Sequence, residues 1–218
     1  MNNLAILIDL WQEEYEDVTA DKKIILTETP KHSFFYNRMI KIPQYRLSDS
    51  IINFIESRLD ISTIILASYE IVEEIESEYV WYENSRKLLG KERFYKKNSF
   101  FKKNQKNTEK IKTDSRILNW KTNKKQIAMH YLYELKILLE KNAYDAIYFC
   151  GESWETCVRQ RPLGYEKVSN LIKKMQINTA IRVRQDCVLT ETNNFFIPSQ
   201  NPNWKKIDSK EYELKCGL

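Results

Sequence analysis

The stretch LAILIDL, residues 4–10, is the clearest guide to the fold of this chain. It is a continuous apolar run that meets a carboxylate at Asp9. A strand with one solvated face alternates apolar and polar residues, whereas an unbroken apolar run is typical of a central strand covered on both faces. Residues 4–10 therefore predict such a strand, with Asp9 near its carboxyl end.

Further runs of the same kind alternate with segments of helical periodicity. Strands are expected at residues 62–70, 116–121, 144–150 and 178–189, and helices at residues 48–60, 71–89, 123–142 and 154–175. This alternation is typical of βαβ units and a mostly parallel sheet with helices on both faces. The sequence therefore predicts an α/β fold, a three-layer αβα sandwich, in which functional sites gather at the carboxyl ends of the strands.

Composition favours one globular domain over residues 1–218. Of the 218 residues, 42% are hydrophobic, enough for one substantial core. The formal net charge is +5, which does not by itself indicate a nucleic-acid partner. No apolar run approaches the roughly 20 residues of a membrane helix, and acidic residues come too early for a signal peptide. We therefore expect a soluble, cytoplasmic protein without a membrane partner.

A lysine-rich segment at about residues 86–115 interrupts this pattern and is expected to be a surface insertion. Its lysines alternate with aromatic residues, among them Phe94, Tyr95, Phe100 and Phe101. Single-strand nucleic-acid binders use stacking rings and phosphate contacts in this way. Nucleic acid is thus an alternative partner, although lysine and asparagine are frequent throughout the chain.

Cys157 is the candidate nucleophile. It follows the strand predicted at residues 144–150 and falls in what reads as the first turn of a helix, where a thiolate is stabilised. Asp9 could accept its proton, and Lys121, at the end of another predicted strand, could favour the ionised sulfur. Each residue also has a plainer interpretation: Cys157 as core packing, Asp9 as a loop cap and Lys121 as one more surface lysine.

The motifs around these residues resemble the isochorismatase-like cysteine hydrolases. In GESWETCV, residues 151–158, the cysteine stands six residues after a glycine that ends a strand and is followed by valine. CVRQRPLGY, residues 157–165, is similar to a C-V-x-x-R-P-x-G version found in one branch of that family. The sequence Asp9-Leu10-Trp11 after the first strand matches the same branch.

The resemblance implies a six-stranded parallel sheet and a catalytic triad of Cys157, Asp9 and Lys121. It also implies a cis peptide between Glu152 and Ser153, so that the backbone amides of Ser153 and Cys157 form an oxyanion hole. The expected activity is hydrolysis of an amide-type C–N bond in a small molecule, in a homo-oligomer. Vinyl ether hydrolysis, which would not use the cysteine as a nucleophile, is the family's other chemistry.

Departures from the family qualify this expectation. Nicotinamidases carry a metal site of Asp and several His, but this chain has only His32 and His130, so we expect no metal and no cofactor. Trp11, Glu152 and Trp154 are candidates for the substrate pocket. Glu152 and Glu155 would oppose thiolate formation and favour a cationic or amine-bearing substrate. The alternative is a catalytically decayed domain that acts as a binding protein.

Overall fold

The computed structural model describes residues 1–8, 10, 44–67, 80–89, 115–151, 154–189 and 203–214. The elements formed by these residues are, in chain order, β1 (Asn3–Ile8), α2 (Gln44–Glu56), β2 (Ile61–Ala67), α3 (Val80–Leu89), α6 (Ser115–Leu118), β3 (Lys125–Ala128), α7 (Leu132–Lys141), β4 (Ala146–Gly151), the π-helical turn η1 (Trp154–Val158), α8 (Tyr165–Met175), β5 (Ala180–Val188), β6 (Trp204–Lys206) and β7 (Glu211–Leu214).

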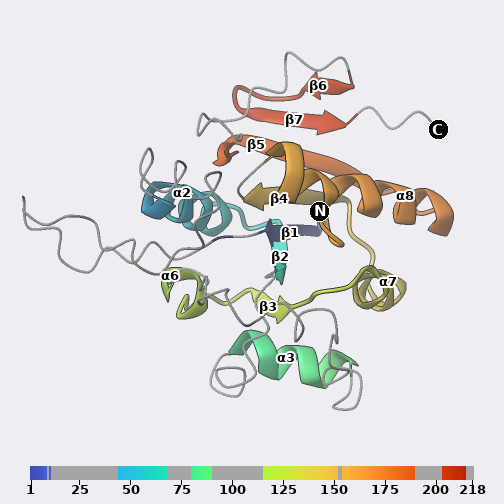
Figure 1. The fold of residues 1–218 in the computed structure, drawn as a ribbon, viewed down its shortest axis with the longest axis horizontal. Helices are drawn as coiled ribbons and strands as arrows, with labels where there is room; N and C mark the ends of the chain where they lie inside the picture. Colours follow the sequence, from blue (N-terminus) through green and yellow to red (C-terminus); the bar gives the residue numbers. More distant parts are fainter. Residues whose placement is uncertain are drawn as a thin grey trace, which may run out of the picture.

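One sheet contains all seven strands of the described residues, in the order β3-β2-β1-β4-β5-β7-β6 (Figure 1). The strands from β3 to β5 are parallel, and β7 and β6 are antiparallel to their neighbours. The expected α/β class with a mostly parallel sheet is confirmed. The expected number of six strands is wrong, because β6 and β7 add an antiparallel hairpin beyond β5.

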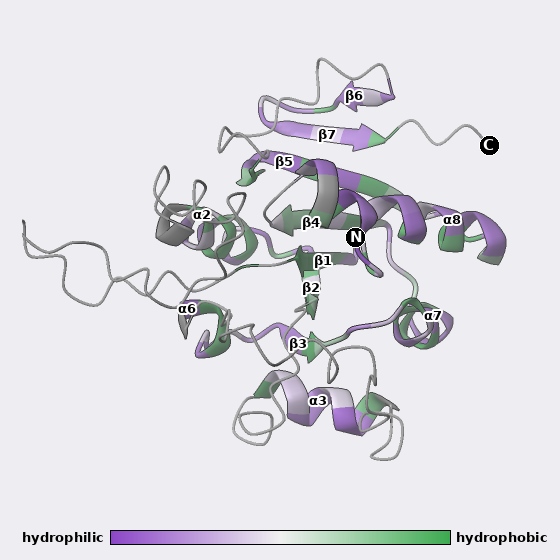
Figure 2. Ribbon diagram, viewed as in Figure 1, coloured by the Kyte–Doolittle hydropathy of each residue, from purple (hydrophilic) through white to green (hydrophobic). Residues whose placement is uncertain are grey.

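Helices cover both faces of this sheet. Leu4, Ile6 and Ile8 of β1 pack into the core under α7 and α8, whereas Ala5 and Leu7 pack into the core under α2 and α6. Figure 1 shows these two pairs of helices on opposite sides of the strands, with α3 beside β3. The central strands are accordingly apolar (Figure 2). Burying each leucine or isoleucine contributes roughly 1.5–3 kcal/mol, so both faces of β1 stabilise the sandwich.

The third strand lies later in the chain than predicted. Residues 116–121 do not form a strand; residues 115–118 are the short helix α6, and the strand is β3, at Lys125–Ala128. The helix predicted at residues 123–142 therefore begins only at α7. Four residues that run directly toward a helix cannot be separated from it by periodicity, and only pairing with β2 distinguishes them as a strand.

The helix predicted at residues 154–175 is interrupted at residues 161–164. Pro162 has no N–H to donate and disfavours helical geometry at Arg161. The amide of Gly164 turns back to the Arg161 carbonyl at 2.8 Å, and a Cβ on Gly164 would lie 2.5 Å from the carbonyl oxygen of Arg159. Proline and glycine thus separate the helical turn that contains Cys157 from α8.

A charged network on the α2 face fixes the β6–β7 hairpin to the sheet. Arg58 donates to both carboxylate oxygens of Asp60 at 2.8 Å and to Glu211 of β7 at 2.7 Å. The Tyr148 hydroxyl of β4 accepts from Arg58 at 3.0 Å and donates to Glu211 at 3.1 Å. The hydrogen bond from Arg58 lowers the pKa of Asp60. Glu211, a buried carboxylate, joins the hairpin to the turn that follows α2.

The basic segment predicted at residues 86–115 is described only where it overlaps α3 and α6, and residues 90–114 lie outside the described residues. Its role as an insertion or as a nucleic-acid contact therefore stays a prediction. Across the described ranges, every helix is too short or too polar to traverse a lipid bilayer.

Candidate functional site

The carboxyl ends of β1 and β4 lie in direct contact. Ile8 is paired with Gly151 in the parallel register. Gly151 has φ +144°, and a Cβ on it would lie 2.1 Å from the Ile8 carbonyl oxygen. Only glycine fits so close an approach at a positive φ. The chain therefore enters the turn with Cys157 directly beside the end of the strand that precedes Asp9.

Cys157 lies in η1, the first helical turn after β4, as the sequence predicts. The turn is held against β5: the Trp154 amide donates to the Leu189 carbonyl at 2.8 Å, and the Leu189 amide donates to the Gly151 carbonyl at 3.1 Å. The Cys157 carbonyl accepts from the Arg161 amide at 3.1 Å. π-Helical turns are rare in proteins, and those that occur are often found at functional sites. The Cys157 side chain is buried, 6% exposed.

Trp154 is part of an aromatic cluster in the core rather than of an open surface. Its ring stacks on Tyr165 of α8 at 4.8 Å between centroids, and Trp204 of β6 meets both rings edge-on. Trp154 is 5% exposed. Trp154 therefore packs in the core, and its place in the wall of a substrate pocket stays a prediction. Tyr165 and Trp204 were missed, since no local pattern indicates which aromatic residues meet across the sheet.

Lys121 lies at the opposite edge of the sheet from Cys157. It precedes the amino end of β3, and Lys125, the first residue of that strand, pairs with Thr63 near the start of β2. Its neighbour Lys124 donates to the carbonyls of Arg58 and Ile61, which precede and begin β2. The six residues of β1 span about 20 Å from edge to edge. The prediction that Lys121 ends a strand beside Cys157 is therefore wrong.

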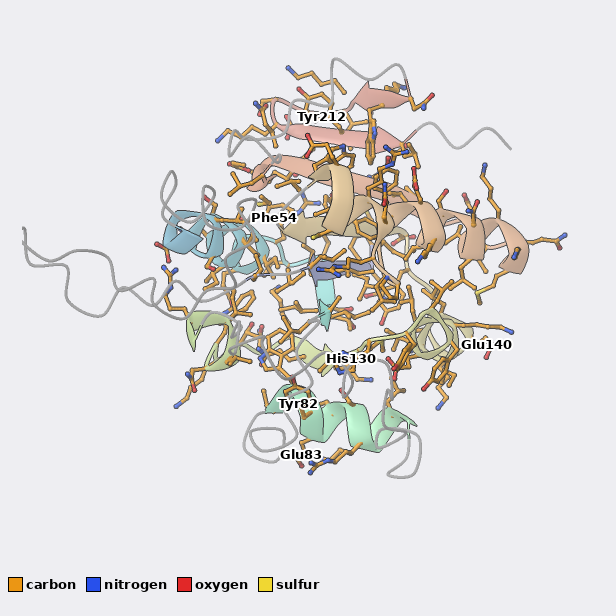
Figure 3. The ribbon with its side chains drawn as sticks, in the orientation of Figure 1. Phe54, Tyr82, Glu83, His130, Glu140 and Tyr212 are labelled. Carbon is orange, nitrogen blue, oxygen red and sulfur yellow. The ribbon has the colours of Figure 1, made fainter. Side chains whose placement is uncertain are left out.

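His130 follows β3, just past its carboxyl end. Its amide and that of Tyr131 donate to the buried Glu134 carboxylate at 2.6 and 2.9 Å. Figure 3 labels His130 near β3. Because β3, β2, β1 and β4 are parallel, their carboxyl ends lie at the same edge of the sheet. The signal that could have located His130 is the short apolar run IAM, residues 127–129, immediately before it.

The other described thiols lie on the opposite face of the sheet from Cys157. Cys150 and Cys187 belong to the core under α2, and each is fully buried. Burial raises the pKa of the Cys187 thiol, and the adjacent Cys150 raises it further. These two thiols are therefore internal references against which the reactivity of Cys157 can be measured.

Several predicted site residues lie outside the described residues: Asp9, Trp11, Glu152 and Ser153. The cis peptide between Glu152 and Ser153 and the oxyanion hole they imply therefore stay predictions, as does a homo-oligomer. Within the described ranges, no three or more His, Cys, Asp or Glu side chains are grouped so that they could hold a metal ion.

Comparison with known proteins adds no relative to this description. No protein-family model, no curated protein and no solved structure gives a significant match to the chain.

Proposed function

We propose that the chain is a cysteine hydrolase that cleaves an amide-type C–N bond of a small molecule, with Cys157 as nucleophile and Asp9 as base. The observation that carries the proposal is the contact between Gly151 and the end of β1. Through this contact, Ile8, which precedes Asp9 in the chain, and Gly151, which precedes the turn with Cys157, lie side by side at one edge of the sheet. Parallel α/β sheets bind ligands at that edge.

The proposed reaction needs only these two side chains and water. The Asp9 carboxylate accepts the thiol proton of Cys157, and the thiolate attacks the carbonyl carbon of the substrate. The C–N bond then breaks, the amine takes the proton from Asp9, and a thioester on Cys157 remains. Water, deprotonated by Asp9, attacks the thioester, so that the carboxylic acid leaves and the thiol is restored. The backbone amides of Ser153 and Cys157 are the proposed oxyanion donors.

Lys121 is not part of this proposal, because it precedes the amino end of β3, at the opposite end of the parallel strands from the turn with Cys157. Glu155 lies in the same turn as Cys157 and is partly exposed. A carboxylate at this place, with Glu152 before it in the sequence, favours a cationic or amine-bearing substrate.

Acylation by p-nitrophenyl acetate tests the proposal without knowledge of the substrate. We expect a burst of p-nitrophenol and a single acetyl group on Cys157, detected by peptide mass spectrometry, since a thioester intermediate forms before water releases it. Cys157→Ala is expected to abolish the burst. Cys150→Ala, which removes a thiol from the other face, is the matched control and should keep it. A burst that survives Cys157→Ala would refute the proposal.

A binding protein without chemistry is the second candidate, and the low exposure of Cys157 favours it. A thiol at 6% exposure, in a turn fixed by an aromatic cluster, is also what a decayed enzyme would retain as packing. Absence of both burst and acetylation at Cys157 would favour this second function.

A further inference from the structure

The β6–β7 hairpin extends the sheet, and side chains on both of its faces contact the rest of the domain. β7 pairs antiparallel with β5, and β6 pairs with β7. On the α2 face, Glu211 and Glu213 of β7 bind arginines of the sandwich, at 2.7 Å to Arg58 and 2.9 Å to Arg182. On the other face, Trp204 and Tyr212 belong to the core that also contains Cys157. The hairpin is therefore anchored on one face while its rings pack on the other.

Trp204 touches the chain on both sides of Cys157. Its ring lies 5.4 Å from that of Trp154, at 67°, and 5.6 Å from that of Tyr165, at 73°. Trp154 is the first residue of η1 and Tyr165 the first of α8. The rings of Trp154 and Tyr165 are stacked on each other, with an angle of 12° between their planes. Trp204 thus packs against both ends of the segment that contains the candidate nucleophile.

The packing of Trp204 depends on its ring and not on its indole N–H. Trp204 is 5% exposed, and its Nε1 is buried without a hydrogen-bond partner among the described residues. A buried indole N–H usually finds a partner. What the site uses is therefore the aromatic surface, and a phenylalanine ring should retain much of that contact.

From these contacts we propose that Trp204 is a positioning residue for Cys157, clamping residues 154–165 so that the thiol keeps its place beside the end of β1. This inference rests on the proposed role of Cys157 as the nucleophile. Without the Trp204 ring, the stacked pair loses its edge-on neighbour, and the hydrogen bond from Trp154 to Leu189 remains to hold the start of the turn. The turn then opens locally while the rest of the sheet stays folded.

The test is iodoacetamide alkylation of Cys157, Cys150 and Cys187, measured by peptide mass spectrometry between about pH 5 and 9 in full-length variants. Trp204→Ala removes the clamp, and Trp204→Phe keeps an aromatic ring. The matched control is Trp120→Ala, because Trp120 is also a buried tryptophan, 7% exposed, but lies in the core on the other face. Cys150 and Cys187 report general unfolding in every sample.

In Trp204→Ala we expect alkylation of Cys157 at high pH to accelerate about tenfold, while Cys150 and Cys187 stay protected. Its pH midpoint should move toward the ordinary thiol value of about 8.5. Trp204→Phe should restore the parent profile. Trp120→Ala should leave the alkylation rate of Cys157 unchanged, because Trp120 packs in the core that contains Cys150 and Cys187 rather than Cys157.

Equal acceleration of all three thiols in Trp204→Ala, or a parent-like Cys157 rate, would overturn the inference. A parent Cys157 that already titrates at the ordinary thiol value would count against the nucleophile proposal instead. The rate ratio in Trp204→Ala would then still decide whether the clamp exists, so the two failures are distinguishable.

Discussion

Replacing Gly151 with alanine is expected to lower the free energy of unfolding by at least about 3 kcal/mol. The new Cβ would lie 2.1 Å from the carbonyl oxygen of Ile8, and its φ of +144° is one that residues with a side chain rarely adopt. The neighbouring atoms are backbone atoms of β1, which cannot turn aside as a side chain could. Urea unfolding followed by circular dichroism measures the loss.

Ala146→Gly is the matched control for this substitution. Ala146 begins the same strand, is fully buried and also differs from glycine by one methyl group. Its replacement should cost about 1 kcal/mol, through backbone entropy. Gly151→Ala with a stability equal to that of the parent, or no lower than that of Ala146→Gly, would show that β1 and β4 do not meet as closely as described.

The second large effect is expected for Glu211→Gln, which should lower the free energy of unfolding by about 3 kcal/mol. Glu211 is 5% exposed and contacts the guanidinium groups of Arg58, at 2.7 Å, and Arg184, at 3.7 Å. Glutamine preserves the shape but removes one of the two carboxylates that each arginine contacts, since Arg58 also pairs with Asp60 and Arg184 with Asp186. The Tyr148 hydroxyl also donates to this carboxylate. The substitution therefore weakens contacts of β7 with the turn after α2, with β4 and with β5 at the same time.

Glu213→Gln is the control for the second prediction. Glu213 lies on the same strand and pairs with Arg182 at 2.9 Å, but its side chain is 33% exposed. Solvent screens such a pair, so the expected loss is about 1 kcal/mol or less. Figure 3 labels Tyr212, the residue between these two glutamates, whose ring packs into the core on the other face. Equal losses in both glutamate variants would mean that the burial of Glu211 is unimportant.

The strands that the sequence predicted well are those buried on both faces. β1 and β4 are buried along their whole length, and β2 at every residue except Ser62, because each side of each strand meets a helical layer. β3 was missed because it has four residues, begins with lysine and runs directly toward α7. The β6–β7 hairpin has no comparable local pattern, since the residues that fix it, Arg58 and Glu211, are far apart in sequence.

The candidate site, like the fold, could be predicted only where a local sequence pattern marks it. Cys157 was located correctly because a glycine-ended strand followed by a helical turn is a local pattern. Lys121 was not, because its choice depended on the wrong third strand within a lysine-rich stretch. The contact of Trp204 with Trp154 and Tyr165 arises only when the chain folds back along β5, and no local spacing encodes it.

The most direct test of Cys157 as an activated nucleophile is its alkylation rate by iodoacetamide as a function of pH, in the parent, Asp9→Asn and Lys121→Ala. We predict that Cys157 reacts well below the ordinary thiol pKa of about 8.5, that Asp9→Asn changes this profile and that Lys121→Ala does not. Cys150 and Cys187 should stay unreactive. A Cys157 that is inert, or that titrates like an ordinary thiol whatever stands at position 9, would contradict the proposed hydrolase.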